Sequence, residues 1–133
     1  MRRRVVCVLA ALAVATTAAP ALAHHSFAAE FDADKPVSVK GVITAVRLEN
    51  PHSWFFLDVA GSDGKVEKWS FEASTPSSLI RSGFKVGTVK AGDEITIKGY
   101  HARDAASNAG AGRELVMADG RAFAIGPTVG AQR

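Results

Sequence analysis

Residues 52–73 read HSWFFLDVAGSDGKVEKWSFEA, two runs rich in aromatic and branched side chains on either side of a short polar turn. Runs of this kind are typical of β-strands. The turn ends in Gly64, and a three-residue loop would place this glycine where the backbone needs a positive φ. The sequence therefore predicts a β-hairpin with strands over residues 52–59 and 65–73.

The loop length also predicts the register of this hairpin, and the register separates its two faces. Apolar pairs fall on one face: Phe55 with Phe71, and Leu57 with Trp69. An ion pair and a mixed pair fall on the other: Asp58 with Lys68, and Trp54 with Glu72. Because side chains alternate across a strand, we expect the apolar face to lie in the core and the other face to lie outside.

The segments on either side of the hairpin predict another strand and a helix. Residues 37–46 are rich in β-branched side chains and predict one long strand, in which a slip of the alternation at Gly41 indicates a bulge. Asn50-Pro51 is typical of a turn. Beyond the hairpin, Thr75-Pro76 is typical of the start of a short helix that ends at Gly83.

The C-terminal part predicts a further strand and a second hairpin. Residues 94–100 alternate as a strand does, and residues 114–118 and 122–125 predict a hairpin over Asp119-Gly120. The small, polar stretch 104–112 predicts a mobile loop. Three strands, a short helix and then more strands is the order of an OB-fold. We therefore expect a mainly β protein, a small five- to six-stranded OB-like Greek-key barrel with one short helix.

The first residues of the chain predict export. Arg2-Arg3-Arg4 precede an apolar run over residues 5–15, which is long enough for a signal peptide and too short to span a bilayer. Cleavage signals of the A-x-A type end at Ala21 and Ala23, and the second is preferred because it leaves His24 as the first residue. We expect a periplasmic or secreted protein.

This processing divides the chain into four parts. They are a signal peptide (1–23), an N-terminal lead-in (24–36), the OB-like barrel domain (37–126) and a flexible tail (127–133).

Composition excludes two classes of protein. The single cysteine, Cys7, leaves with the signal peptide, so the processed chain has no thiol chemistry. The chain has sixteen Lys and Arg against thirteen Asp and Glu, and the three N-terminal arginines also leave, so the processed chain is neutral. A neutral domain lacks the electrostatic footprint of a nucleic-acid-binding protein.

Histidines are the candidate metal ligands. The chain has four: His24, His25, His52 and His101. A first-residue histidine chelates a metal ion with its own amine, and imidazole favours copper, with zinc as the second choice. Cleavage after Ala21 would make His24 the third residue, which is also a copper-binding start. We expect a site of His24, His25, His52 and Glu72; otherwise the paired histidines are solvated residues of a loose terminus and His52 is structural.

A second candidate site is the outer face of the hairpin. His52, Trp54 and Phe56 share this face, and the corresponding strands of OB-folds bind ligands. The rival to metal binding is thus a metal-free module that binds a protein, peptide or glycan there, including another periplasmic protein. Alternatively, Phe27 and Phe31 of the lead-in cover the two aromatic rings.

Catalysis is the weakest of the three functions. Glu72, Asp58 and His52 could form an acid–base set, which would make the chain a small hydrolase using Glu72. The sequence has no G-x-S-x-G nucleophile turn, no phosphate-binding loop and no spaced histidine pair of a zinc protease. The sequence therefore favours a binding module over an enzyme.

Several short motifs resemble those of a family of small exported bacterial proteins of uncharacterised function. They are His24-His25-Ser26-Phe27, Asn50-Pro51-His52, Trp69-Ser70-Phe71-Glu72, Pro76…Leu79…Gly83 and Gly92-Asp93. The resemblance covers nearly the whole processed chain. It implies a periplasmic location and a barrel-like domain, and it implies no reaction.

Overall fold

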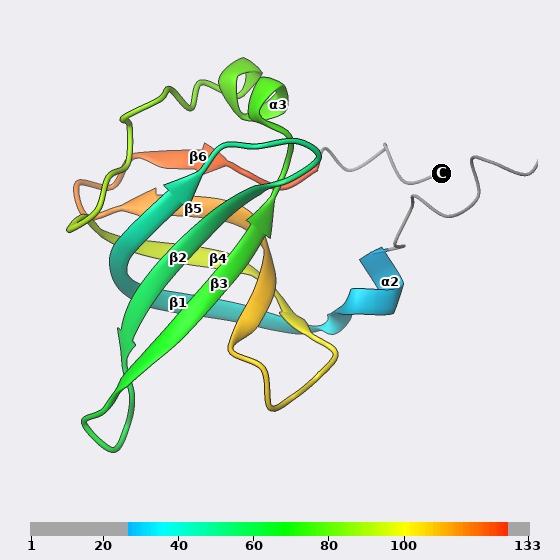
Figure 1. Ribbon diagram of the computed structural model, residues 1–133, viewed down its shortest axis with the longest axis vertical. Coiled ribbons are helices and arrows are strands. Elements are labelled where there is room, and N and C mark those ends of the chain that lie inside the picture. Colours follow the sequence, from blue (N-terminus) through cyan, green and yellow to red (C-terminus); the bar gives the residue numbers. More distant parts are fainter. Residues whose placement is uncertain (1–26, 128–133) are drawn as a thin grey trace, which may run out of the picture.

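The computed structural model describes residues 27–127. Within this range, two helices and six strands follow one another: α2 (Phe27–Glu30), β1 (Phe31–Arg47), β2 (Ser53–Ala60), β3 (Val66–Ala73), α3 (Pro76–Arg81), β4 (Glu94–Ala102), β5 (Ala109–Met117) and β6 (Ala122–Ala124) (Figure 1). The expected signal peptide (1–23) lies outside the described residues. So do His24 and His25 of the expected lead-in, and residues 128–133 of the expected tail.

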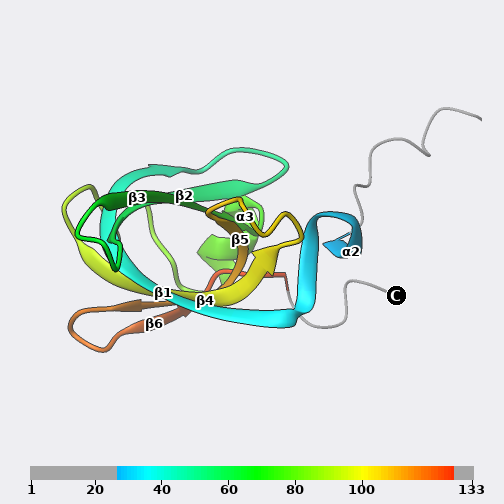
Figure 2. The same ribbon diagram turned by 90° about the horizontal axis from the view of Figure 1, so that it is seen from below.

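The strands form one sheet that closes on itself. Their order is β3-β2-β1-β4-β5-β6, and β3 also pairs with β5, so strands β1 to β5 make a barrel-like ring (Figure 2). The closing β3–β5 pair is parallel and every other pair is antiparallel. α3 lies in the connection between β3 and β4. The structure confirms the expected fold, which is mainly β and has the strand order of an OB-fold with one short helix, α3. The single helical turn α2 is additional.

The central hairpin has the register that the sequence predicted. Phe55 pairs with Phe71, Leu57 with Trp69 and Trp54 with Glu72. Gly64 has the positive φ, 80°, that the loop requires. The register holds because a loop of fixed length leaves only one pairing that puts the apolar side chains on the same face.

The short helix also begins and ends where the sequence predicted. The Thr75 side chain accepts a hydrogen bond from the Ser78 backbone N–H at 3.3 Å, and Pro76 occupies the first turn. Gly83 follows the helix with a φ of 91°. Thr75 therefore satisfies one of the backbone N–H groups that the first turn leaves unpaired.

β1 differs from the prediction at both its start and its bulge. It begins at Phe31, so residues 31–36 of the expected lead-in belong to this strand and run beside β4. The bulge lies between Ile43 and Ala45, and the prediction at Gly41 was wrong. Gly41 lies on the buried face, where a Cβ atom would come within 2.7 Å of the Asp58 carbonyl oxygen. Close strand approach, and not a bulge, explains this glycine.

The expected mobile loop over residues 104–112 is only partly a loop, because β5 already begins at Ala109. The first residues of β5 are small, and this allows β5 to pack closely between β3 and β4. A Cβ atom on Gly110 would lie 2.8 Å from the Phe71 ring and 2.6 Å from the Tyr100 carbonyl oxygen. The glycines thus permit the contact that closes the ring.

The second predicted hairpin is present as β5 and β6, joined through Asp119 and Gly120. Backbone and side-chain hydrogen bonds from Arg121 hold the pKa of the Asp119 carboxyl below its usual value.

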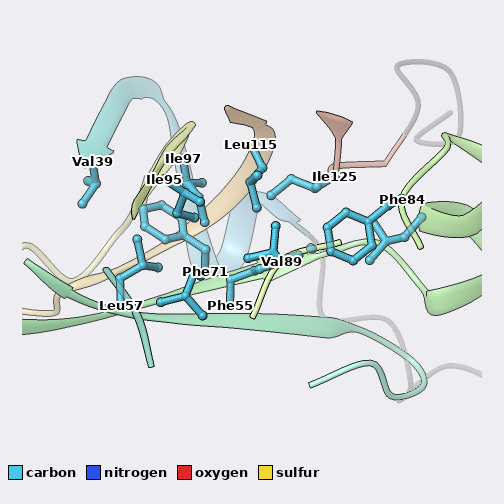
Figure 3. Packing of buried hydrophobic residues seen from close by; sticks show 13 residues of the cluster. Val39, Phe55, Leu57, Phe71, Phe84, Val89, Ile95, Ile97, Leu115 and Ile125 are labelled. Atoms are coloured by element: carbon cyan, nitrogen blue, oxygen red, sulfur yellow. The ribbon is translucent and has the colours of Figure 1, made fainter. Parts of the chain in front are cut away.

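The core fills the inside of the ring (Figure 3). Thirteen buried side chains from β1 to β5, from the α3 region and from the residue after β6 form one cluster: Val39, Ile43, Phe55, Leu57, Phe71, Ala73, Leu79, Phe84, Val89, Ile95, Ile97, Leu115 and Ile125. Trp69, which the sequence placed in the core, is partly buried and packs against this cluster. One continuous cluster of this kind indicates one domain.

Candidate functional site

The candidate site lies on the outer face of β2 and β3. Burial alternates along β2, where Ser53, Phe55 and Leu57 are buried and the residues between them are half-exposed. Trp54 and Phe56 therefore lie on the outer face, as the sequence predicted. His52 precedes the strand directly, next to the cis Asn50–Pro51 peptide bond.

The structure brings His52 and Glu72 together. The Nδ1 atom of His52 is hydrogen-bonded to Oε1 of Glu72, across the β2–β3 ladder. The Glu72 side chain is 14% exposed and the His52 side chain 49% exposed, so the carboxylate is sheltered and the ring faces outward. Because an ionised carboxylate only accepts hydrogen bonds, Nδ1 carries the proton, and the neutral ring keeps a free lone pair on Nε2.

Beside this pair lies an aromatic surface that also includes an arginine. The Trp54 and Phe56 rings are stacked, with centroids 6.5 Å apart and planes inclined by 23°. The Arg47 guanidinium lies 5.1 Å from the Phe56 ring centre, in the range of a cation–π contact. Sequence reasoning missed Arg47, because its pairing with Trp54 depends on the position of the β1 bulge.

Phe27 and Phe31 do not cover this surface. The Phe27 ring packs against Phe31, at 5.4 Å, and against Tyr100 of β4, at 5.9 Å. The Arg103 side chain donates a hydrogen bond to the Ala28 carbonyl and holds α2 at the β4 end of the ring. The alternative in which these phenylalanines cover Trp54 and Phe56 was wrong, because residues 31–36 follow β4 instead of crossing β2.

The other described histidine lies elsewhere. The His101 ring stands edge-on to Trp69 at 5.6 Å, and its Nδ1 donates to the Ala102 carbonyl oxygen at 2.7 Å. Within residues 27–127, no group of three or more His, Cys, Asp and Glu side chains is arranged to hold a metal ion. The predicted metal site would thus combine His52 and Glu72 with His24 and His25, which precede the described part.

The acid–base set suggested by the sequence is not assembled. Asp58 pairs with Lys68 at 3.0 Å, six residues along β2 from His52, which corresponds to about 20 Å of strand. Ser53, the hydroxyl nearest to His52 in sequence, is fully buried on the inner face. Asp58 therefore shares the outer face with His52 and Glu72 but lies too far along it to act with them, and Ser53 lies on the other face.

Fold and site together define a small β-ring domain with a carboxylate-oriented histidine beside an aromatic surface. The chain belongs to DUF6152, a family of unknown function that matches residues 11–111. The resemblance to an uncharacterised family is thereby confirmed. Neither the curated proteins nor the solved structures contain a significant match. In the part of the chain that the structure describes, neither helix has the length and apolar character to cross a membrane.

Proposed function

We propose that the processed chain is a periplasmic metal-binding module that favours copper over zinc. In this proposal the Nε2 atom of His52 is a ligand, Glu72 orients its ring, and His24, with the terminal amine, and His25 complete the site. The module binds a metal ion and catalyses no reaction of its own.

The observation that carries the proposal is the hydrogen bond between Glu72 and His52. Histidines that bind metals commonly donate their second N–H to a carboxylate, which fixes the tautomer and raises the basicity of the ligating nitrogen. Here the sheltered carboxylate holds Nδ1, and the exposed side of the ring offers Nε2. Copper(II) is the divalent ion that imidazole and amine nitrogens bind most tightly.

The position of α2 supports a contribution from the N-terminus. His24 lies three positions before Phe27, and this length of chain, when extended, would reach about 10 Å. In both ribbon views, α2 and the connection between β1 and β2 lie on the right-hand side of the molecule, with α2 lower in Figure 1 (Figures 1 and 2). His52 is in this connection, so the histidines need not cross the ring to approach it.

A second candidate function uses the aromatic surface without a metal. Trp54 and Phe56 are half-exposed, stacked rings with the Arg47 cation over one of them. Such a surface fits a protein, peptide or glycan whose flat or apolar groups stack on the rings. It would be the leading function if no metal bound to the chain.

Calorimetric titration with copper(II) separates the two. We expect the His52→Ala variant, and a variant with one extra residue before His24, each to bind copper at least about tenfold more weakly. Glu72→Gln should weaken copper binding by about 10- to 100-fold, which is the usual effect of mutating a residue that hydrogen-bonds to a metal ligand. His101→Ala is the matched control and should bind as the unchanged chain does, because His101 faces Trp69.

Circular dichroism of each variant establishes that it is folded. If every variant, and the unchanged chain, binds copper no more tightly than an isolated surface histidine, the metal site does not exist. The aromatic surface then becomes the leading candidate.

A further inference from the structure

The segment from α3 toward β4 carries only positive charges before Asp93. No aspartate or glutamate occurs between Glu72 and Asp93, whereas Arg81, Lys85 and Lys90 all lie in this interval. The three cations are exposed. In Figure 1 the segment leaves α3 at the top of the molecule and runs down to the start of β4, and its residues Phe84 and Val89 belong to the core cluster.

These cations differ from the other lysines in having no carboxylate partner. Within residues 27–127, five lysines form ion pairs: Lys35 with Asp32, Lys40 with Glu94, Lys65 with Asp63, Lys68 with Asp58, and Lys98 with Glu114. In the same range, Arg81, Lys85 and Lys90 have no carboxylate oxygen within 4.0 Å. The Asp93 side chain accepts from the Lys90 backbone N–H and leaves the ammonium group free of it.

Exposed aliphatic side chains stand directly beside two of the cations. Val86, next to Lys85, is 79% exposed, and Ile80, next to Arg81, is 57% exposed. Val86 is the most exposed of the large hydrophobic residues that the structure describes. It is followed by Gly87, whose φ of 81° turns the chain and leaves Val86 at the tip of a loop.

We propose that this segment is a peripheral contact site for an anionic lipid bilayer. Lysine and arginine near a membrane are attracted to anionic headgroups, and aliphatic side chains beside them enter the boundary with the acyl chains. The unpaired cations supply the first contribution, and the exposed aliphatic side chains of Ile80 in α3 and Val86 at the loop tip supply the second. The site is independent of the metal site, because it shares no residue with the His52 surface.

An acidic protein is the other partner with matching charge. It would use the groove of about 310 Å³ between β1 and this segment, which Val46, Leu48, Phe84 and Lys90 help to line. Val86 also lines this groove, whereas Ile80, which is 57% exposed, does not. The bilayer is favoured because a peptide in the groove would leave Ile80 exposed. Glu49, next to Leu48, would also repel an acidic peptide there.

Vesicle sedimentation of the processed chain tests the proposal, with phosphatidylglycerol vesicles compared with phosphatidylcholine vesicles. We expect binding to the first only, and loss of binding as the salt rises from about 0.1 M to about 1 M, since the screening length falls from about 10 Å to about 3 Å. The triple variant Arg81→Gln, Lys85→Gln, Lys90→Gln should bind about 100-fold more weakly, or about fivefold for each cation.

Two matched controls keep the test specific. The triple variant Lys40→Gln, Lys65→Gln, Lys68→Gln removes the same net charge from ion-paired lysines and should keep its vesicle affinity. Val86→Asp should abolish binding, whereas Val66→Asp, at a residue 63% exposed on the hairpin, should not. Absence of binding to phosphatidylglycerol, or an equal loss in the control variants, would overturn the proposal. Binding to poly-L-glutamate without binding to vesicles would assign the segment to an acidic protein.

Discussion

Glu72 lies opposite Trp54 in the β2–β3 ladder, but its carboxylate contacts His52, the diagonal neighbour. The sequence predicted this neighbourhood, because the hairpin loop fixes which residues are diagonal and diagonal side chains come within reach of each other. The hydrogen bond itself could not be predicted, since it depends on the side-chain rotamers. His52 and Glu72 were thus predictable as neighbours, whereas His24 and His25 are linked to them only by the proposed function.

The first prediction at this scale concerns the tautomer of His52. Nitrogen-15 spectra of the imidazole ring should show the proton on Nδ1 in the neutral form, because Glu72 accepts it. In the Glu72→Ala variant the Nε2–H form should gain population. A neutral His52 ring that carries its proton on Nε2 in the unchanged chain would contradict the geometry on which the metal site rests.

A second prediction concerns Gly99 of β4, where the neighbouring strand β5 leaves no room for a side chain. A Cβ atom on Gly99 would lie 1.9 Å from the Ala111 carbonyl oxygen, a backbone atom that moves only with the strand. We expect Gly99→Ala to lower the free energy of unfolding by about 3 kcal/mol or more, measured by urea denaturation. Gly64→Ala is the control, because its Cβ would meet nothing within 4 Å and only the positive φ would cost about 1 kcal/mol. Equal losses would contradict the close packing.

At the scale of elements, the local hairpins and the helix were predictable and the closure of the ring was not. Turn residues and caps lie within a few positions of the elements that they define, so Gly64 and Thr75 could be interpreted directly. The start of β5 was missed because Ala109–Gly112 has the small residues of a loop. Those residues are small to fit between β3 and β4, and this requirement comes from contacts distant in sequence.

The prediction at this scale compares the two faces of the central hairpin. Leu57 and Phe71 are 1% and 0% exposed, so truncating either to alanine should cost about 2–5 kcal/mol of unfolding free energy. Trp54 is half-exposed on the outer face, and Trp54→Ala should cost clearly less. Chemical denaturation of the three variants measures the difference. A loss at Trp54 equal to that at Phe71 would mean that the outer face is covered, and the aromatic surface would then have no free ring to offer.

For the whole molecule, the fold class could be predicted from the order of the elements. The course of residues 31–36 could not. The predicted lead-in would have crossed the β2–β3 face, but residues 31–36 extend β1 along β4 instead. A strand extension of this kind is decided by the partner strand, which pairs Pro36 with Tyr100. The proposed metal site must therefore be reached from the end of the molecule at which α2 lies, and not from above the face.

Processing is the prediction that the copper proposal needs first. The apolar run and the cleavage signal at Ala23 predict that the exported protein begins at His24. The intact mass of protein recovered from the periplasm under denaturing conditions measures this. Retention of Met1, or an attached lipid, would contradict both the location and the amine that the site requires.

Native mass spectrometry of the same protein tests metal binding most directly, because it reports the N-terminus and the bound ion in one spectrum. We predict a chain that begins at His24 and carries one copper ion, which is lost from the His52→Ala variant and kept by His101→Ala. A chain that begins at His24 and stays metal-free after incubation with copper, or that keeps copper equally well without His52, would contradict the account.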